Sequence, residues 1–139
     1  MARSIDEVMT HDPRTVETGD TLVEAARVLA EADIGSVVVV ENGQVKGILT
    51  DRDIVVRALA EGRDPGATKV GEVASLDVTT VTPDQELDEA IRLMREHDVR
   101  RLPVVKDGRP AGIISLGDIA VERDPESLLA DISAASPND

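Results

Sequence analysis

The apolar positions near the start of the chain predict an amphipathic helix. Between residues 21 and 32 they recur at spacings of three and four, on one helical face: Leu22, Ala25, Ala26 and Leu29. Thr21 and Glu24 fit a capping box at its start, and Asp20 is an alternative N-cap. A short extended segment, "RTVE", precedes this helix.

A hairpin follows the helix. The β-branched run "SVVVV" is typical of a buried strand, and Asn42-Gly43 predicts a tight turn because both residues tolerate positive φ. A second strand, 46–50, leads into another helix near Asp51. We expect that helix to end at Gly62 and to carry one apolar face: Ile54, Val55, Ala58 and Leu59.

The chain then repeats this pattern. Residues 6–57 align with residues 71–122 without a gap, with many identities in one frame, such as Glu7 with Glu72 and Asp53 with Asp118. The second copy again has an extended segment "TTVT", a helix, "LPVV", an Asp-Gly turn, a strand and a helix start. Such a duplication predicts two β-α-β-β-α units in an α/β (α+β) fold, in which each first helix connects parallel strands by a right-handed crossover.

The repeat sets the expected boundaries. We predict a first repeat over 1–62, a second over 63–122, and a C-terminal helix with a frayed tail over 123–139. The segment 61–68 has the Gly, Pro and charge content of a linker. Ser4 and Glu7 fit a capping box for a short leading helix.

The amino-acid composition argues against several classes of function and partner. The net charge of −13 disfavours nucleic acid and anionic membranes as partners, since both bind cationic faces. The chain has no aromatic residue and no cysteine, so thiolate catalysis and cysteine metal sites are excluded. No enzyme motif is present, and we expect a non-enzymatic protein. The sequence contains no stretch like a signal peptide or membrane span, and we expect a cytoplasmic location.

One short motif occurs in both repeats. "GILTDRDIV" contains Thr50 and Asp53, and "GIISLGDIA" contains Ser115 and Asp118 at the same spacing. A single aspartate at this place could simply stabilise a helix N-terminus. The duplicated motif, each copy after an Asn/Asp-Gly hairpin, resembles the tandem CBS-domain pair, named after cystathionine β-synthase and also called a Bateman module. The resemblance covers roughly residues 3–122, and the chain looks like the stand-alone, small bacterial type.

The resemblance implies two repeats related by a pseudo-twofold axis, with two clefts that hold an adenosine nucleotide in many members. Asp53 and Asp118 would each accept hydrogen bonds from ribose hydroxyls, and Thr50 and Ser115 would donate to phosphate. Further ligand-binding positions for the Asp118 cleft are Met9, Arg14, Ile34, Gly35, Arg100 and Arg101; those for the Asp53 cleft include Thr79 and Val99. Gly35-Ser36 stand where the second repeat has Arg100-Arg101, so the Asp118 cleft is the better phosphate site.

These implications favour a regulatory module that senses an adenosine nucleotide, AMP-, ADP- or ATP-like, and signals to a separate protein. It would require no cofactor, and by resemblance it would form a homodimer through helices such as 21–32, 52–61 and 86–97. The alternative is a structural or interaction protein that self-associates with empty clefts. A divalent-metal binder using His11 or His97 ranks third, since neither histidine has a partner at ligand spacing.

Overall fold

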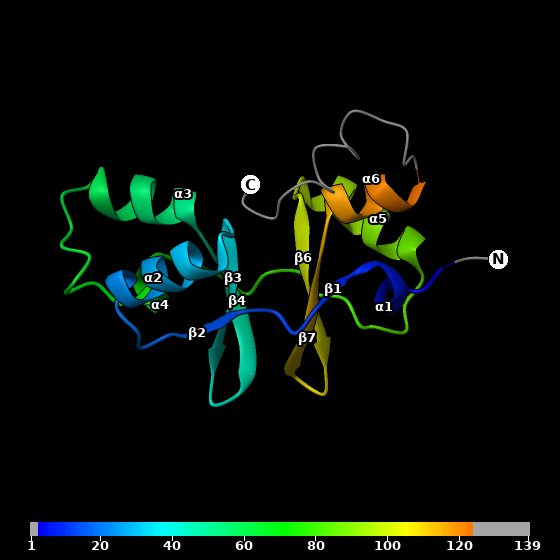
Figure 1. Cartoon of the computed structure of the whole chain (residues 1–139), viewed down its shortest axis with the longest axis horizontal. Helices are drawn as coiled ribbons and strands as arrows, with labels where there is room; N and C mark the ends of the chain where they lie inside the picture. Colours follow the sequence, from blue (N-terminus) through cyan, green and yellow to red (C-terminus); the bar gives the residue numbers. More distant parts are fainter. Residues whose placement is uncertain (1–2, 124–139) are drawn as a thin grey trace. The chain divides into compact units, whose positions relative to one another are not determined.

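The computed structural model describes residues 3–123 of the 139-residue chain, and these form two compact units (Figure 1). The first-repeat unit consists of residues 14–78, and the second-repeat unit consists of residues 3–13 together with 79–123. Both units mix helices with a sheet, as the pattern of the sequence predicts. The C-terminal helix predicted after Arg123 lies outside the described residues.

The sheet of the first-repeat unit has the order β2-β3-β4-β5. Its strands are β2 (Thr15–Glu17), β3 (Ser36–Glu41), β4 (Gln44–Thr50) and β5 (Ser75–Leu76). β2 and β3 are parallel, and α2 (Leu22–Ala32) connects them, which confirms the predicted parallel pair joined by a helix. β3 and β4 form the predicted hairpin, whose turn residues Asn42 and Gly43 have φ of 53° and 79°.

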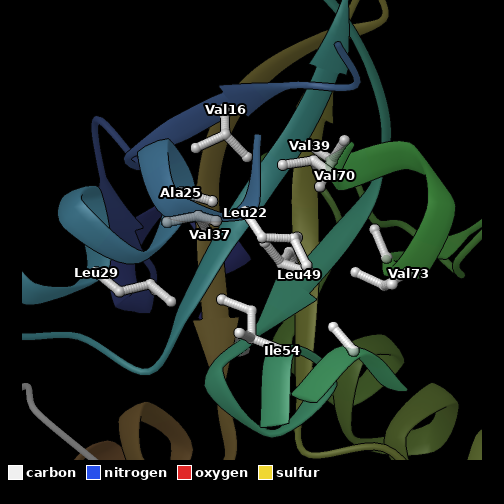
Figure 2. Close-up of a cluster of buried hydrophobic side chains, with 12 residues drawn as sticks. Val16, Leu22, Ala25, Leu29, Val37, Val39, Leu49, Ile54, Val70 and Val73 are labelled. Atoms are coloured by element: carbon white, nitrogen blue, oxygen red, sulfur yellow. The ribbon is translucent and has the colours of Figure 1, made fainter. Parts of the chain in front are cut away.

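Helices cover one face of this sheet. They are α2, α3 (Asp51–Asp53) with its continuation η1 (Ile54–Leu59), and α4 (Val70–Val73). Figure 2 shows the aliphatic core that they enclose with the strands, to which α2 contributes Leu22, Ala25 and Leu29. The predicted apolar face of α2 is thus the buried one except for Ala26, which is exposed.

η1 differs from the expectation. It is a π-helix, with the amide of Ala60 bonded to the carbonyl of Val55 five residues earlier. Ile54 and Ala58 are buried, whereas Val55 and Leu59 are 54% and 52% exposed. The four residues predicted to line one apolar face therefore divide into a buried pair and an exposed pair, because the core takes only the residues at i and i+4 on this short helix.

The second-repeat unit has the sheet order β1-β7-β6. Its elements are α1 (Ile5–Val8), β1 (Thr10–His11), α5 (Leu87–His97), β6 (Arg101–Lys106), β7 (Arg109–Ser115) and α6 (Leu116–Arg123). The predicted strand "TTVT" is reduced to a single parallel bridge between Val81 and Val104. Pro83 explains this: the equivalent Thr18 donates its amide to Val40 in the first repeat, and proline has no amide proton to donate.

The compact units do not coincide with the sequence repeats 1–62 and 63–122. The leading segment of each repeat packs in the unit of the other: β1 pairs with β7, and β5 pairs with β4. Apolar residues hold these segments in place, with Ile5 and Val70 both fully buried. A repeat in sequence is therefore not a compact unit in space.

Each leading segment packs closely against a glycine of the neighbouring strand. A Cβ on Gly47 would lie 2.0 Å from the carbonyl oxygen of Ser75, and one on Gly112 would lie 2.6 Å from that of Thr10. Both distances are far shorter than an ordinary van der Waals contact. The glycine that begins each repeated motif is thus needed for close backbone approach.

Candidate functional site

The two motif aspartates form the same local structure. The Thr50 amide donates to Asp53 Oδ2 at 2.9 Å, and the Asp53 amide donates to Thr50 Oγ1 at 3.1 Å. Ser115 and Asp118 form the same pair of bonds, at 2.9 and 3.1 Å. Each pair is a reciprocal capping box with aspartate in the place of glutamate. The duplicated spacing therefore serves the start of a helix, whatever else it binds.

The two carboxylates differ in what faces their second oxygen. Asp53 Oδ1 lies 3.7 Å from Nε of Arg57, one turn further along the helix. The position equivalent to Arg57 is Glu122, and within residues 3–123 no hydrogen bond or ion pair reaches Oδ1 of Asp118. Asp118 thus keeps one acceptor oxygen uncommitted within the described part of the chain.

Burial affects the pKa of Asp118. It raises the pKa of the Asp118 carboxyl above its ordinary value, and the hydrogen bonds from Ser115 offset part of that rise. A carboxylate in such an environment gains from a ligand that donates hydrogen bonds to it, because its ionised form is under-solvated.

Arg101 is the cross-strand neighbour of the serine of this motif. Arg101 and Ser115 are register partners on β6 and β7, and Ser36 and Thr50 are the equivalent partners on β3 and β4. Within residues 3–123 neither Arg100 nor Arg101 takes part in a salt bridge. The second-repeat unit therefore brings a guanidinium, a hydroxyl and a partly buried carboxylate onto adjacent elements. In the first-repeat unit, Ser36 stands at the position equivalent to Arg101.

The two units also share a backbone hydrogen bond at the start of the motif helix. The amide of Leu116 donates to the carbonyl of Arg100 at 2.7 Å, and the amide of Asp51 donates to that of Gly35 at 3.0 Å. Val99, two residues after the end of α5, is 39% exposed. Each predicted pair, Ile34-Gly35 and Val99-Arg100, is therefore fixed against the start of the motif helix in its own unit.

The remaining predicted residues are divided between the units. Met9 is 7% exposed in the core of the second-repeat unit, so its side chain fills the core, while its backbone leads into β1. Thr79 begins the later segment of that unit. Arg14 and Ile34 belong to the first-repeat unit, where the Arg14 carbonyl accepts the amide of Val38 at 3.1 Å. Their participation in a site with Asp118 stays a prediction.

Within residues 3–123, neither histidine belongs to a cluster of side chains that could bind a metal ion. His11 Nε2 lies 3.0 Å from the carbonyl oxygen of Asp6. Among residues 3–123, no three His, Asp or Glu side chains gather closely enough to hold a metal ion. None of the helices in that part of the chain is both long and apolar enough to cross a membrane.

Two features of these sites were not predicted from the sequence: the capping boxes at the motif aspartates and the exchange of leading segments between the repeats. The reciprocal capping boxes could have been found from the spacing alone, because Ser/Thr followed three residues later by an acid is their signature. The exchange of leading segments left only a weak signal, the two motif glycines, whose requirement depends on a strand from a distant part of the chain.

Comparison with known proteins agrees with this geometry. The CBS-domain family model matches residues 5–59 and 70–123. The chain therefore belongs to the CBS-domain family and carries two CBS domains, which confirms the resemblance drawn from the repeated motif.

Similar proteins include stand-alone CBS proteins. The CBS domain-containing protein YhcV of Bacillus subtilis is 42% identical over 120 residues, covering 86% of this chain and 85% of that protein. A crystal structure of Hypoxic Response Protein I with two coordinated zinc ions has a TM-score of 0.78 at 35% identity, covering 85% of this chain and 97% of that one. The CBS domain pair of protein MJ0100, in complex with 5′-methylthioadenosine and S-adenosyl-L-methionine, has a TM-score of 0.81 at 25% identity, covering 91% and 100%.

Proposed function

We propose that this protein is a regulatory module that binds an adenosine nucleotide or nucleoside, with Asp118 as the ribose-binding carboxylate. The observation that carries the proposal is the uncommitted oxygen of Asp118, on a partly buried carboxylate near Arg101 and Ser115. A ribose offers two adjacent hydroxyl donors, and an ionised carboxylate accepts both.

The neighbouring residues support the same ligand class. Arg101 would contact a phosphate or another anionic group with bidentate geometry, and the Ser115 hydroxyl would donate to it. The MJ0100 domain pair binds two ligands that contain adenosine, which supports an adenosine ligand here. We propose one principal site, at Asp118, because Asp53 already faces Arg57 and Ser36 replaces the arginine.

Regulation would follow from a population shift. A ligand that binds one arrangement of the chain more tightly than another favours that arrangement. We propose that the regulated target is a separate protein. We also propose that the chain forms a homodimer. Self-association has a parallel in a structurally similar CBS-CP12 protein, which is hexameric and has a TM-score of 0.79.

A second function is favoured by one observation. The six-residue helix η1 exposes three large apolar side chains, Val55, Val56 and Leu59. Such a surface suits an interaction protein whose work is self-association.

Thermal unfolding with and without ligands separates the two functions. The chain has no Trp or Tyr, so calorimetry or far-UV circular dichroism should follow the transition. A ligand at about 100 times its Kd adds about 2.7 kcal/mol to the free energy of unfolding. We expect such a shift with at least one of AMP, ATP, 5′-methylthioadenosine and S-adenosylmethionine. No shift with any of them, at millimolar concentration, would leave the interaction protein as the function.

A further inference from the structure

Arg57 connects the first motif aspartate to a distant segment of the same unit. Its Nε lies 3.7 Å from Oδ1 of Asp53, and its Nη1 donates to the carbonyl of Val73 at 3.1 Å. Val73 is the last residue of α4, in the leading segment of the second repeat, and it is 2% exposed. One guanidinium therefore joins the motif helix to this leading segment.

The bond to Val73 holds the guanidinium next to the carboxylate. The ion pair with Asp53 alone would be weak, because the Arg57 side chain is 53% exposed and solvent screens the attraction. A hydrogen bond from a charged donor to a backbone carbonyl is the stronger contact. Val70 and Val73 fix α4 in the core, so this carbonyl stays in place. A ligand that needs Oδ1 of Asp53 must therefore break both contacts of Arg57.

The second repeat has the opposite charge at the equivalent position. Glu122 stands four residues after Asp118, as Arg57 does after Asp53, and its Oε1 accepts Nε of Arg3 at 2.7 Å. Arg3 belongs to the leading segment of the first repeat, so this position again ties the motif helix to an exchanged segment. An ionised glutamate has no hydrogen to donate to another carboxylate, so it leaves Oδ1 of Asp118 open.

We propose that Arg57 is a specificity-determining residue: it blocks the Asp53 carboxylate to adenosine ligands, and removing it gives the chain a second binding site. The inference rests on the proposed function, in which the free oxygen of Asp118 accepts a ribose hydroxyl. Asp53 has the same capping box and begins the same kind of helix as Asp118. The residue four positions later is thus the difference closest to the carboxylate.

The unblocked site would favour an adenosine ligand without phosphate. Ser36 stands at the cross-strand position that Arg101 occupies in the second repeat. A Cβ on Gly35 would lie 3.5 Å from a carboxylate oxygen of Asp51, so an acid lies beside the same edge. A phosphate would meet repulsion there and no matching guanidinium. We therefore expect uncharged 5′-methylthioadenosine to occupy this site in preference to AMP.

Calorimetric titration with 5′-methylthioadenosine counts the sites. Arg57→Met keeps most of the side-chain length and removes the guanidinium. We expect one ligand per chain for the wild type, two for Arg57→Met, and one again when Asp53→Asn is added to Arg57→Met. Affinity at Asp53 should rise by about 10–100-fold, the range of one charged hydrogen bond.

Two controls accompany this count. Arg27→Met removes an arginine from the same unit that forms no salt bridge within residues 3–123, and it should still bind one ligand. AMP in place of 5′-methylthioadenosine should give no second molecule on Arg57→Met at the same concentrations. A change that only loosened the fold would not produce this preference for one ligand.

The reciprocal change transfers the block to the second repeat. Glu122→Arg places a guanidinium four residues after Asp118, and Val8 ends α1 as Val73 ends α4. We expect this variant to weaken the wild-type site at least about tenfold. Glu122→Gln loses the ion pair with Arg3 without adding a cation, and it should bind within about threefold of the wild type. Far-UV circular dichroism checks that each variant is folded.

The possible results separate this inference from the proposed function. If the wild type and Arg57→Met each bind one ligand, or each bind two, Arg57 does not block Asp53, and the proposed function stands. If neither protein binds 5′-methylthioadenosine or AMP, both the proposed function and this inference are wrong. Should Arg57→Met fail to fold, equal affinities for Glu122→Arg and Glu122→Gln would overturn the inference.

Discussion

Replacing Gly47 with alanine tests whether the exchanged leading segment is part of the stable fold. The added Cβ would lie 2.0 Å from the carbonyl oxygen of Ser75 and 3.0 Å from Cα of Leu76. Both neighbours are backbone, so no side chain can rotate away. β5 must move outward by more than an ångström to restore an ordinary contact.

The cost follows from what β5 holds in place. The strand continues from α4, whose Val70 and Val73 are 0% and 2% exposed in the core. Overpacking that is relieved by a backbone shift costs about 1–3 kcal/mol. Full release of the segment would expose both valines, at about 1.5–3 kcal/mol each. We expect Gly47→Ala to lower the free energy of unfolding by about 2–4 kcal/mol, after the small gain from a less flexible unfolded chain.

Urea unfolding followed by far-UV circular dichroism measures this loss. Gly19→Ala is the matched control. Among the described residues, no atom beyond Gly19 and its two chain neighbours lies within 4 Å of the position of the added Cβ, so this change should alter stability by no more than about 0.5 kcal/mol. Equal stabilities for the two variants would refute the close packing of β5 on Gly47.

The remaining predictions concern the motif residues. Ser115→Ala removes a cap and should cost about 1 kcal/mol of stability, measured by thermal unfolding. The raised pKa of Asp118 means that its protonated form favours the fold: this stabilisation is present at acid pH and is lost as the pH rises through the folded-state pKa, so wild type should gain stability over Asp118→Asn on acidification. A pH titration in which the two curves stay parallel would contradict this. Arg101→Ser should weaken a phosphate-containing ligand by about 10–100-fold in calorimetric titration, while a ligand without phosphate changes less.

The local structure was predictable because its causes are local. The hairpins depend on Asn42-Gly43 and Asp107-Gly108, which adopt the positive φ expected of them. The capping boxes depend on residues three apart in sequence. The class of fold followed from the duplication, since two copies of one hydrophobic pattern restrict the possible topologies.

The rest depended on contacts between distant segments. Nothing in Ser75-Leu76 indicates that they pair with β4 in preference to the strands of their own repeat. The π-helical η1 exposes Val55 because the core takes only Ile54 and Ala58 there. The environment of Asp118 likewise depends on packing, because burial raises the pKa of its carboxyl. It also depends on a difference between the repeats, since Glu122 occupies the position of Arg57, the residue that faces Asp53.

The central claim is tested most directly by calorimetric titration of the wild type, Asp118→Asn and Asp53→Asn with 5′-methylthioadenosine, S-adenosylmethionine, AMP and ATP. Asparagine keeps an acceptor for the capping bond, so both variants should fold. We predict that at least one ligand binds the wild type, that Asp118→Asn weakens it at least about tenfold, in line with a charge-assisted bond, and that Asp53→Asn leaves it within about threefold. Binding that survives Asp118→Asn unchanged, or no binding of any of the four, would contradict the account.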